Sequence, residues 1–264
     1  ILNEVKATGV GDNKNVLVEL NIETTRHQEI QVIGNGDWCI TLGGRDCSLQ
    51  MHEQKLLEVS VTRESLQSAE ARATQAGAAD EAAVLAQDVK TLDAMEAEAA
   101  RFGEAVGLDS VSTFECIVDR DQHCFMEMNT RIQVEHPVSE MITGFDLVKA
   151  QLKLALDMEI TLDQEEIIFR GHAMECRINA EDPETFIPSP GIINKMHPPG
   201  GFGVRFDAHI YSGYVVPPHY DSLLAKIITT ANTCLLYTSD TADDTPCLDL
   251  SGRRIIKKKR RGGG

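Results

Sequence analysis

Residues 125–137 read Phe-Met-Glu-Met-Asn-Thr-Arg-Ile-Gln-Val-Glu-His-Pro, a run in which polar and apolar side chains largely alternate. In an extended segment alternate side chains share a face, so one face would carry the polar set. That set is Glu127, Asn129, Arg131, Gln133 and Glu135. The opposite face would carry Met126, Met128, Ile132 and Val134. The pattern predicts either a site that holds a divalent cation beside a small anion, or the solvated face of an amphipathic edge strand.

The polar side chains of this run suit different tasks. Mg²⁺ takes oxygen ligands from one or two carboxylates and from substrate phosphates, which fits Glu127 and Asn129. Arg131 offers a planar fork of donors that matches carboxylate, bicarbonate or phosphate oxygens. Glu135 is a candidate base beside such an anion, provided that its neighbours hold it at a useful pKa.

A second strand is predicted just before this run, at Val111–Asp119, with an acidic turn between the two. In the resulting hairpin Glu115 would lie opposite Glu127. Carboxylates that face each other on neighbouring strands repel unless a cation lies between them. This pairing therefore favours a metal site independently of the polar run.

Composition limits the classes of protein to which the chain can belong. With 264 residues and 42% hydrophobic residues, it can bury one sizeable core or two small ones. Its formal charge of −16 argues against a nucleic-acid partner, because phosphate contacts require a basic surface. No apolar run approaches the length of about 20 residues that a transmembrane helix needs, so we expect a cytoplasmic protein without membrane contact. The seven cysteines lack the repeated close spacing of a zinc site or a disulfide framework.

Residues 62–106 are rich in Ala, Glu, Gln and Asp, with apolar residues near the helical period. Thr62 can cap a first helix, and Gly77 with Asp80 can end it and start a second. The extra helical turns are either solvated decoration, which we favour, or a docking surface for a partner. Beyond the polar run, Val138–Met158 is predicted as one further helix.

Several long motifs resemble those of biotin carboxylases, the ATP-grasp enzymes that carboxylate biotin for acyl-CoA, pyruvate and related carboxylases. The first is Glu-Met-Asn-Thr-Arg-Ile-Gln-Val-Glu-His-Pro at 127–137. The others, in the family's order, are Gly-His-Ala-Met-Glu-Cys-Arg-Ile-Asn-Ala-Glu-Asp-Pro at 171–183, Pro-Ser-Pro-Gly at 188–191 and Pro-Gly-Gly-Phe-Gly-Val-Arg at 199–205. Several long motifs in one order are a much stronger signal than a lone glycine-rich segment.

The resemblance implies an α+β chain, a partial ATP-grasp fold followed by a truncated biotin carboxylase C-terminal domain. The expected boundaries are 1–160 for the ATP-grasp part, with a helical insertion at about 62–106, and 171–230 for the C-terminal part. Residues 234–264 are expected to be disordered and to be a sequencing artefact. The family's N-terminal domain and glycine-rich phosphate loop have no counterpart here, so we expect a fragment that is inactive alone.

The resemblance also implies roles for individual residues. The expected catalytic residues are Glu135, which deprotonates bicarbonate, Arg177, which stabilises the biotin enolate, Arg131 and Lys55. Bicarbonate would contact Gln133, the backbone of Val134, Arg131 and Lys55. ATP would contact His27, Gln50, Glu115 and Glu127. The metal would be held by Glu115, Glu127 and Asn129.

The implied activity is carboxylation of carrier-bound biotin by bicarbonate and ATP through carboxyphosphate, with Mg²⁺ or, in its place, Mn²⁺. This is the first half-reaction of a biotin-dependent acyl-CoA carboxylase such as the acetyl-CoA carboxylase of fatty acid biosynthesis. The implied partners are a biotin carboxyl carrier protein and a carboxyltransferase subunit or domain. A homodimer is also implied, at the positions of Phe202, Arg205 and Asp221.

Two alternative functions stay open, and two departures from the family's pattern bear on the second of them. Leu20 stands where the family normally has a lysine, and Glu53 where it usually has a histidine. One alternative is another ATP-grasp ligase with a different acceptor in place of biotin. The other is a noncatalytic subunit that keeps the fold for assembly.

Overall fold

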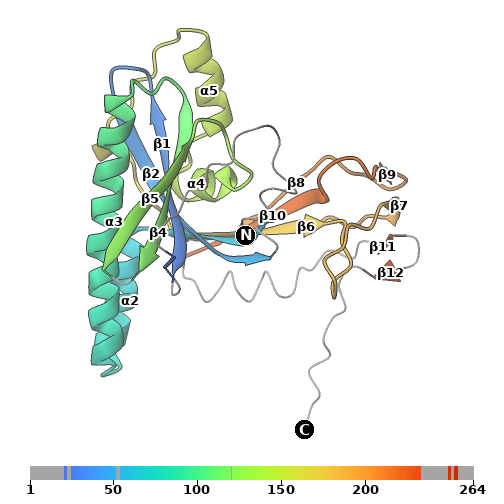
Figure 1. Ribbon diagram of the computed structural model, residues 1–264, viewed down its shortest axis with the longest axis horizontal. Coiled ribbons are helices and arrows are strands. Elements are labelled where there is room, and N and C mark those ends of the chain that lie inside the picture. Colours follow the sequence, from blue (N-terminus) through green and yellow to red (C-terminus); the bar gives the residue numbers. More distant parts are fainter. Residues whose placement is uncertain are drawn as a thin grey trace, which may run out of the picture.

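A computed structural model describes residues 21–22, 25–51, 54–119, 121–232, 249–250 and 253–254. Its centre is an antiparallel sheet of eight strands (Figure 1). In spatial order these are β5 (Gln122–Asn129), β4 (Val111–Asp119), β1 (Arg26–Gly34), β2 (Cys39–Met51), β3 (Gln54–Val61), β6 (His172–Asn179), β10 (Leu223–Ala231) and β8 (Val204–Ala208). Leu20 and Glu53, the two departures from the family's pattern, lie outside the described residues.

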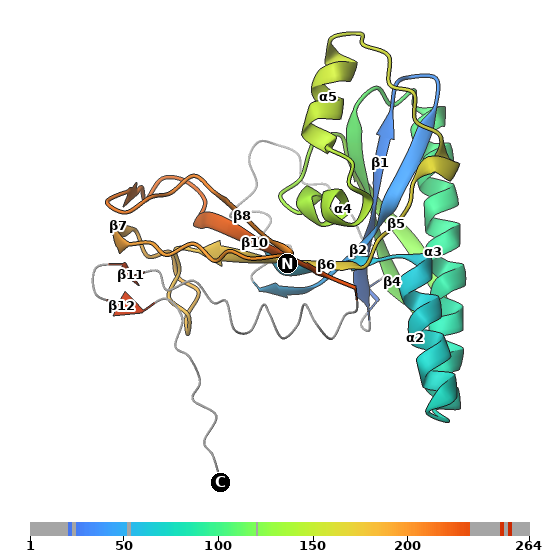
Figure 2. The same ribbon diagram turned by 180° about the vertical axis from the view of Figure 1, so that it is seen from behind.

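Helices cover both faces of the sheet (Figures 1 and 2). One face carries the predicted helical hairpin, α2 (Arg63–Gln75) and α3 (Ala79–Ala105). As predicted, the Thr62 side chain caps α2 by accepting a hydrogen bond from the Ser65 amide, and the chain turns at Gly77, where φ is +74°. Leu92, Met95 and Ala99 of α3 then join the main core beneath the sheet. None of the described helices is both long and apolar enough to cross a membrane.

The opposite face carries α4 (His136–Thr143) and α5 (Leu147–Ala155), followed by a 3₁₀ turn at Gln164–Glu166. The prediction of one helix over Val138–Met158 was therefore wrong. α4 ends at Gly144, which adopts the left-handed conformation with a φ of +72°, and Asp146 caps the start of α5. A glycine in that conformation is a common helix stop, and the aspartate supplies the next N-cap.

The expected extended segment also ends earlier than its alternating pattern indicates. Strand β5 stops at Asn129, the chain bends at Arg131, and residues 134–135 turn directly into α4. Pro137 lies in the first turn of α4, where its fixed φ favours a helix start. The alternation therefore describes one strand face only up to Asn129, and Gln133 and Glu135 reach the site from a turn.

The C-terminal motifs continue the same sheet. Leu57 of β3 pairs with Cys176 of β6, so the two predicted domains share backbone hydrogen bonds. A smaller sheet follows, with the order β12 (Arg253–Arg254), β11 (Asp249–Leu250), β7 (Gly191–Lys195) and β9 (Val215–Val216). β11 pairs with β7 in antiparallel orientation, and the four residues of β11 and β12 belong to the range 234–264. The rest of that range lies outside the described residues.

Candidate functional site

A cluster of charged side chains lies on the sheet face opposite α3, and Glu115 is one of its centres. Its carboxylate lies 2.8 Å from His27 Nε2 and 3.4 Å from Lys55 Nζ. It also accepts hydrogen bonds from Asn129 Nδ2 at 2.9 Å and Gln133 Nε2 at 2.6 Å. Burial alone would raise the pKa of Glu115, but His27, Lys55 and Gln133 outweigh it and lower that pKa to about 2. Glu115 is therefore ionised at neutral pH.

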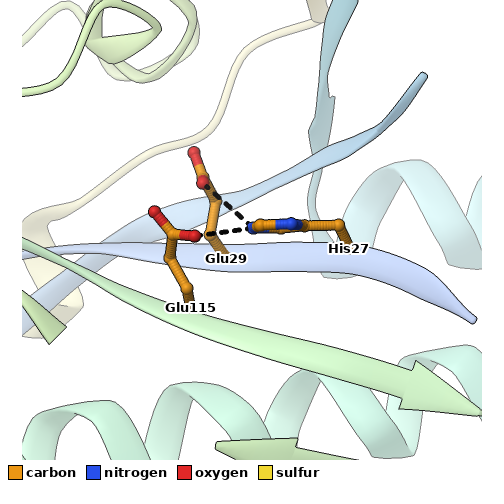
Figure 3. A group of neighbouring side chains, drawn as sticks. All are labelled: His27, Glu29 and Glu115. Atoms are coloured by element: carbon orange, nitrogen blue, oxygen red, sulfur yellow. Dashed lines mark ion pairs between the residues drawn. The ribbon is translucent and has the colours of Figure 1, made fainter. Parts of the chain in front are cut away.

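The strand register brings a second carboxylate to the same place. Glu29 lies directly opposite Glu115 in the β1–β4 pairing, and His27 shares its face two residues away on β1. Figure 3 shows the three side chains converging, with His27 Nε2 3.9 Å from Glu29 Oε2. One ligand atom from each lies within 4.8 Å of the others. This group has the spacing of a small cation site.

The predicted metal ligands are also brought together. Glu127 pairs with Glu115 across the β4–β5 hairpin, which confirms the expected arrangement. The amide of Asn129 lies between their carboxylates, at 2.9 Å from Glu115 and 3.1 Å from Glu127. Two carboxylates and an amide fit Mg²⁺, because an amide that turns its oxygen inward completes a set of oxygen ligands.

Lys55 connects this acidic group to Glu135. Its Nζ lies 2.6 Å from Glu29 Oε2 and 2.6 Å from Glu135 Oε1. Burial lowers the pKa of the Lys55 ammonium, but the attraction of Glu29 and Glu135 outweighs this and raises it. Gln50, the other residue predicted from the same segment, places its Nε2 3.1 Å from His27 Nδ1.

Glu135 is held between two cations. Lys55 contacts one of its oxygens, and Arg177 Nη2 lies 3.0 Å from the other. Burial would raise the pKa of Glu135, but Arg45, Lys55 and Arg177 outweigh burial and lower it to about 2. An incoming anion would compete for the same two cations, and losing either of them would make Glu135 more basic.

Arg131 is the predicted site residue that the described contacts leave outside this cluster. Its side chain is exposed, and its Nη1 lies 3.5 Å from the carbonyl oxygen of Ile132. The bend after Asn129 turns it away from the face that it would have shared with Glu127 on a continuous strand.

The sequence analysis did not predict the buried residues that form ion pairs with this cluster. Arg45 is wholly buried, with Nε 2.6 Å from Glu29 Oε1 and Nη1 2.7 Å from Gln31 Oε1. Glu58, also wholly buried, lies 2.7 Å from Arg177. Charged residues inside otherwise apolar strands were the available signal, because an unpaired buried charge is rarely tolerated.

The buried Glu58 makes stability depend on pH. Burial raises its pKa from the ordinary 4.5 to about 7, although Arg177 acts in the opposite direction. The folded protein therefore holds a proton that the unfolded chain releases, and the free energy of unfolding falls as pH rises from about 4.5 to about 7. Glu58→Gln should remove up to about 1.4 kcal/mol per pH unit of that slope, measured by urea unfolding across this window. Glu159→Gln, at an exposed position, is the control, and parallel curves for wild type and Glu58→Gln would contradict the assignment.

Comparisons with known proteins show which family the chain resembles. The family model for the carbamoyl-phosphate synthase L chain ATP-binding domain matches residues 3–90 and 80–164. The model for the biotin carboxylase C-terminal domain matches residues 175–237. Biotin carboxylase from Haemophilus influenzae is 44% identical over 233 residues, covering 88% of this chain and 47% of that protein. Biotin carboxylase 1 from Bacillus subtilis is 46% identical over 237 residues, covering 88% and 48%.

Solved structures of biotin carboxylases also superpose on the chain. The biotin carboxylase domain of a thermophilic 2-oxoglutarate carboxylase bound to bicarbonate superposes with a TM-score of 0.77 at 36% identity, covering 94% of this chain and 52% of that one. Biotin carboxylase from Campylobacter jejuni, in complex with β-γ-ATP, gives a TM-score of 0.74 at 36% identity, covering 87% and 48%. The chain thus spans about half the length of these relatives. Family models, relatives and solved structures agree over both halves of the described fold, and the chain belongs to the biotin carboxylase family of ATP-grasp ligases.

Proposed function

We propose that the protein to which this chain belongs uses ATP to carboxylate biotin with bicarbonate. The observation that carries the proposal is the ionised Glu135, held between Lys55 and Arg177 beside the carboxylates of Glu115 and Glu127. A site with a base, two cations and a metal-ligand set in contact can activate a small anion and receive a phosphoryl group.

The acidic end of the cluster is assigned to MgATP. Glu115, Glu127 and Asn129 would hold Mg²⁺, or Mn²⁺ in its place, and His27 and Gln50 would contact the nucleotide. The metal, when bound, neutralises charge on the phosphoryl group that is transferred. The convergence of His27 with the buried Glu29 and Glu115 supports this assignment, because two buried acids so close together are costly without a cation.

The other end is assigned to bicarbonate, bound by Lys55, Gln133 and the backbone of Val134. The exposed Arg131 would complete the site by swinging its side chain inward. Glu135 accepts the bicarbonate proton, and the freed oxygen forms a bond to the γ-phosphorus of ATP as the bond to ADP breaks. The product, carboxyphosphate, separates into CO₂ and phosphate.

Biotin then receives the CO₂. Phosphate takes the proton from N1 of biotin, Arg177 stabilises the resulting enolate, and N1 bonds to the carbon of CO₂. Arg177 can serve here because its guanidinium already lies at the site, 3.0 Å from Glu135.

The finer assignments follow from the same family. We place the protein in the cytoplasm, with biotin on a carrier protein and a carboxyltransferase as the next partner, within an acyl-CoA carboxylase such as the acetyl-CoA carboxylase of fatty acid biosynthesis. The solved relatives named above include a 2-oxoglutarate carboxylase domain, so the acceptor is the first of these to test. A homodimer is proposed through Phe202, which is fully exposed, with Arg205 and Asp221.

The test uses this chain joined to the portion of the Haemophilus influenzae relative that precedes the matched region. ATP cleavage is measured with Mg²⁺ and bicarbonate, with and without free biotin. Stimulation by biotin is the expected result. Cleavage that is indifferent to biotin would indicate another ATP-grasp acceptor. A folded protein that neither cleaves MgATP nor binds it by titration calorimetry would indicate a noncatalytic assembly subunit.

A further inference from the structure

Four ionisable side chains share one face of the sheet where β3, β6 and β10 lie side by side. Glu58 on β3 lies opposite Glu175 on β6, and Arg177 on β6 lies opposite Lys226 on β10. Glu175 and Arg177 are two residues apart on one strand, so all four point the same way. Both acids are wholly buried, and α4 packs over this face.

The two cations of this group reach the turn that precedes α4. Arg177 Nη2 lies 3.0 Å from the Glu135 carboxylate, and Lys226 Nζ donates to the carbonyl oxygen of Val134. Arg177 therefore contacts a side chain of the turn, and Lys226 contacts its backbone. Strands β6 and β10 therefore contact two consecutive residues of the site, Val134 and Glu135.

The hydrogen bond of Lys226 is made to the turn and not to the neighbouring acid. Its Nζ is 3.8 Å from Glu175 Oε2, which is beyond hydrogen-bond distance. Within the described residues, neither oxygen of Glu175 has a hydrogen-bond partner. The Lys226 side chain is only 12% exposed, and a lysine is seldom buried to that extent without a specific partner. The partner in this structure is the carbonyl of Val134.

We propose that Lys226 is a positioning residue for bicarbonate, which it serves by fixing the peptide that joins Val134 to Glu135. A peptide unit is planar, so a donor that fixes its carbonyl also fixes the N–H on the other side and the position of the next Cα, from which the Glu135 side chain extends. Glu175, whose carboxylate lies 3.8 Å from the Lys226 ammonium, is the neighbouring acid against which this role must be tested. The inference rests on the proposed function, because it assigns the 133–135 turn to bicarbonate.

Three variants test the inference. Lys226→Met keeps the length of the side chain and removes its donor. Lys226→Met combined with Glu175→Gln also removes the acid that would otherwise be left without a cation. Lys226→Arg keeps a donor and a charge. Lys149→Met, at an exposed position on α5, is the matched control.

Two readouts are used. Hydrogen exchange of residues 133–136 is measured in this 264-residue chain, and the KM values for bicarbonate and MgATP are measured in the completed enzyme. Lys226→Met should speed exchange and raise the bicarbonate KM, each by about tenfold or more, while the MgATP KM stays within about twofold. The double variant should regain wild-type resistance to urea but keep the raised bicarbonate KM. Lys226→Arg should bring that KM part of the way back to the wild-type value.

Other outcomes separate the possibilities. Recovery of both exchange and KM in the double variant would overturn the proposal, because Lys226 would then only neutralise Glu175. A wild-type enzyme without bicarbonate-dependent ATP cleavage would reject the proposed function. In that case the exchange experiment still decides, since unchanged exchange in Lys226→Met would show that this residue does not hold the turn.

Discussion

Glu135→Gln in the completed enzyme is expected to lower biotin-dependent ATP cleavage by a factor of about 10²–10⁴. Glutamine keeps the shape and volume of the side chain but cannot accept the bicarbonate proton. It also removes the negative charge that Lys55 and Arg177 share, so both cations lose their common partner. The loss should appear mainly in kcat, because the removed group acts on the reacting proton.

Under the proposed function, the low pKa of Glu135 predicts that bicarbonate rearranges the site before reaction. At a pKa of about 2 the carboxylate is a weak base, because burial is outweighed by Arg45, Lys55 and Arg177. A bound bicarbonate that draws Lys55 toward itself removes part of that stabilisation and makes Glu135 more basic at the moment when a base is needed. Binding and proton transfer are then coupled through one lysine.

Steady-state ATP cleavage with and without biotin measures this prediction. Glu159→Gln is the control, because Glu159 is an exposed glutamate remote from the turn in the chain. The assignment fails if Glu135→Gln retains more than about a tenth of the biotin-stimulated rate. A raised bicarbonate KM with normal kcat would show that Glu135 only positions its two cations.

Local sequence patterns predicted the parts of the site that are formed by residues close together in the chain. The facing of Glu115 and Glu127 follows from two adjacent strands and a short turn, and the structure confirms it. The cap at Thr62 and the break at Gly77 are likewise local, and both occur where they were predicted. Each of these features depends on residues within one hairpin.

The turn into α4 was missed because alternation of polar and apolar residues continues past the end of β5. A period of two is compatible with a strand, but also with a bend that buries Gln133 and Glu135 and leaves Arg131 in solvent. Pro137, just inside the helix, was the local signal against a continuous strand. The length of the alternating run nevertheless favoured the prediction of a continuous strand over the signal from Pro137.

The supporting ion pairs could not be predicted from local patterns. Lys55 meets Glu135 across 80 positions of sequence, and Arg177 meets Glu58 across 119. Such contacts depend on the strand order, in which β3 lies between β2 and β6. The resemblance to the family identified Lys55, Glu135 and Arg177. It did not predict the buried acids that contact them, Glu29 and Glu58.

Arg45 is the clearest example of such a buried supporting residue. Its substitution is expected to have the largest effect on stability. Its guanidinium is completely buried and joins β2 to β1 through Glu29 and Gln31. It also reaches Ser139 on α4, at 2.9 Å. Attraction to Glu29 and Glu135 outweighs burial and raises the pKa of Arg45, so the guanidinium is charged at neutral pH.

Arg45→Met should lower the free energy of unfolding by about 3–5 kcal/mol, because it leaves buried partners without their cation. Urea unfolding at neutral pH measures the loss. Arg26→Met is the matched control, since the pair of Arg26 with Asp88 is 38% exposed on the arginine side and should contribute about 1 kcal/mol or less. Combining Arg45→Met with Glu29→Gln should cost less than the sum of the two single losses, because the pair acts as one unit. Equal losses for Arg45→Met and Arg26→Met would show that the buried guanidinium stabilises the fold no more than an exposed pair does.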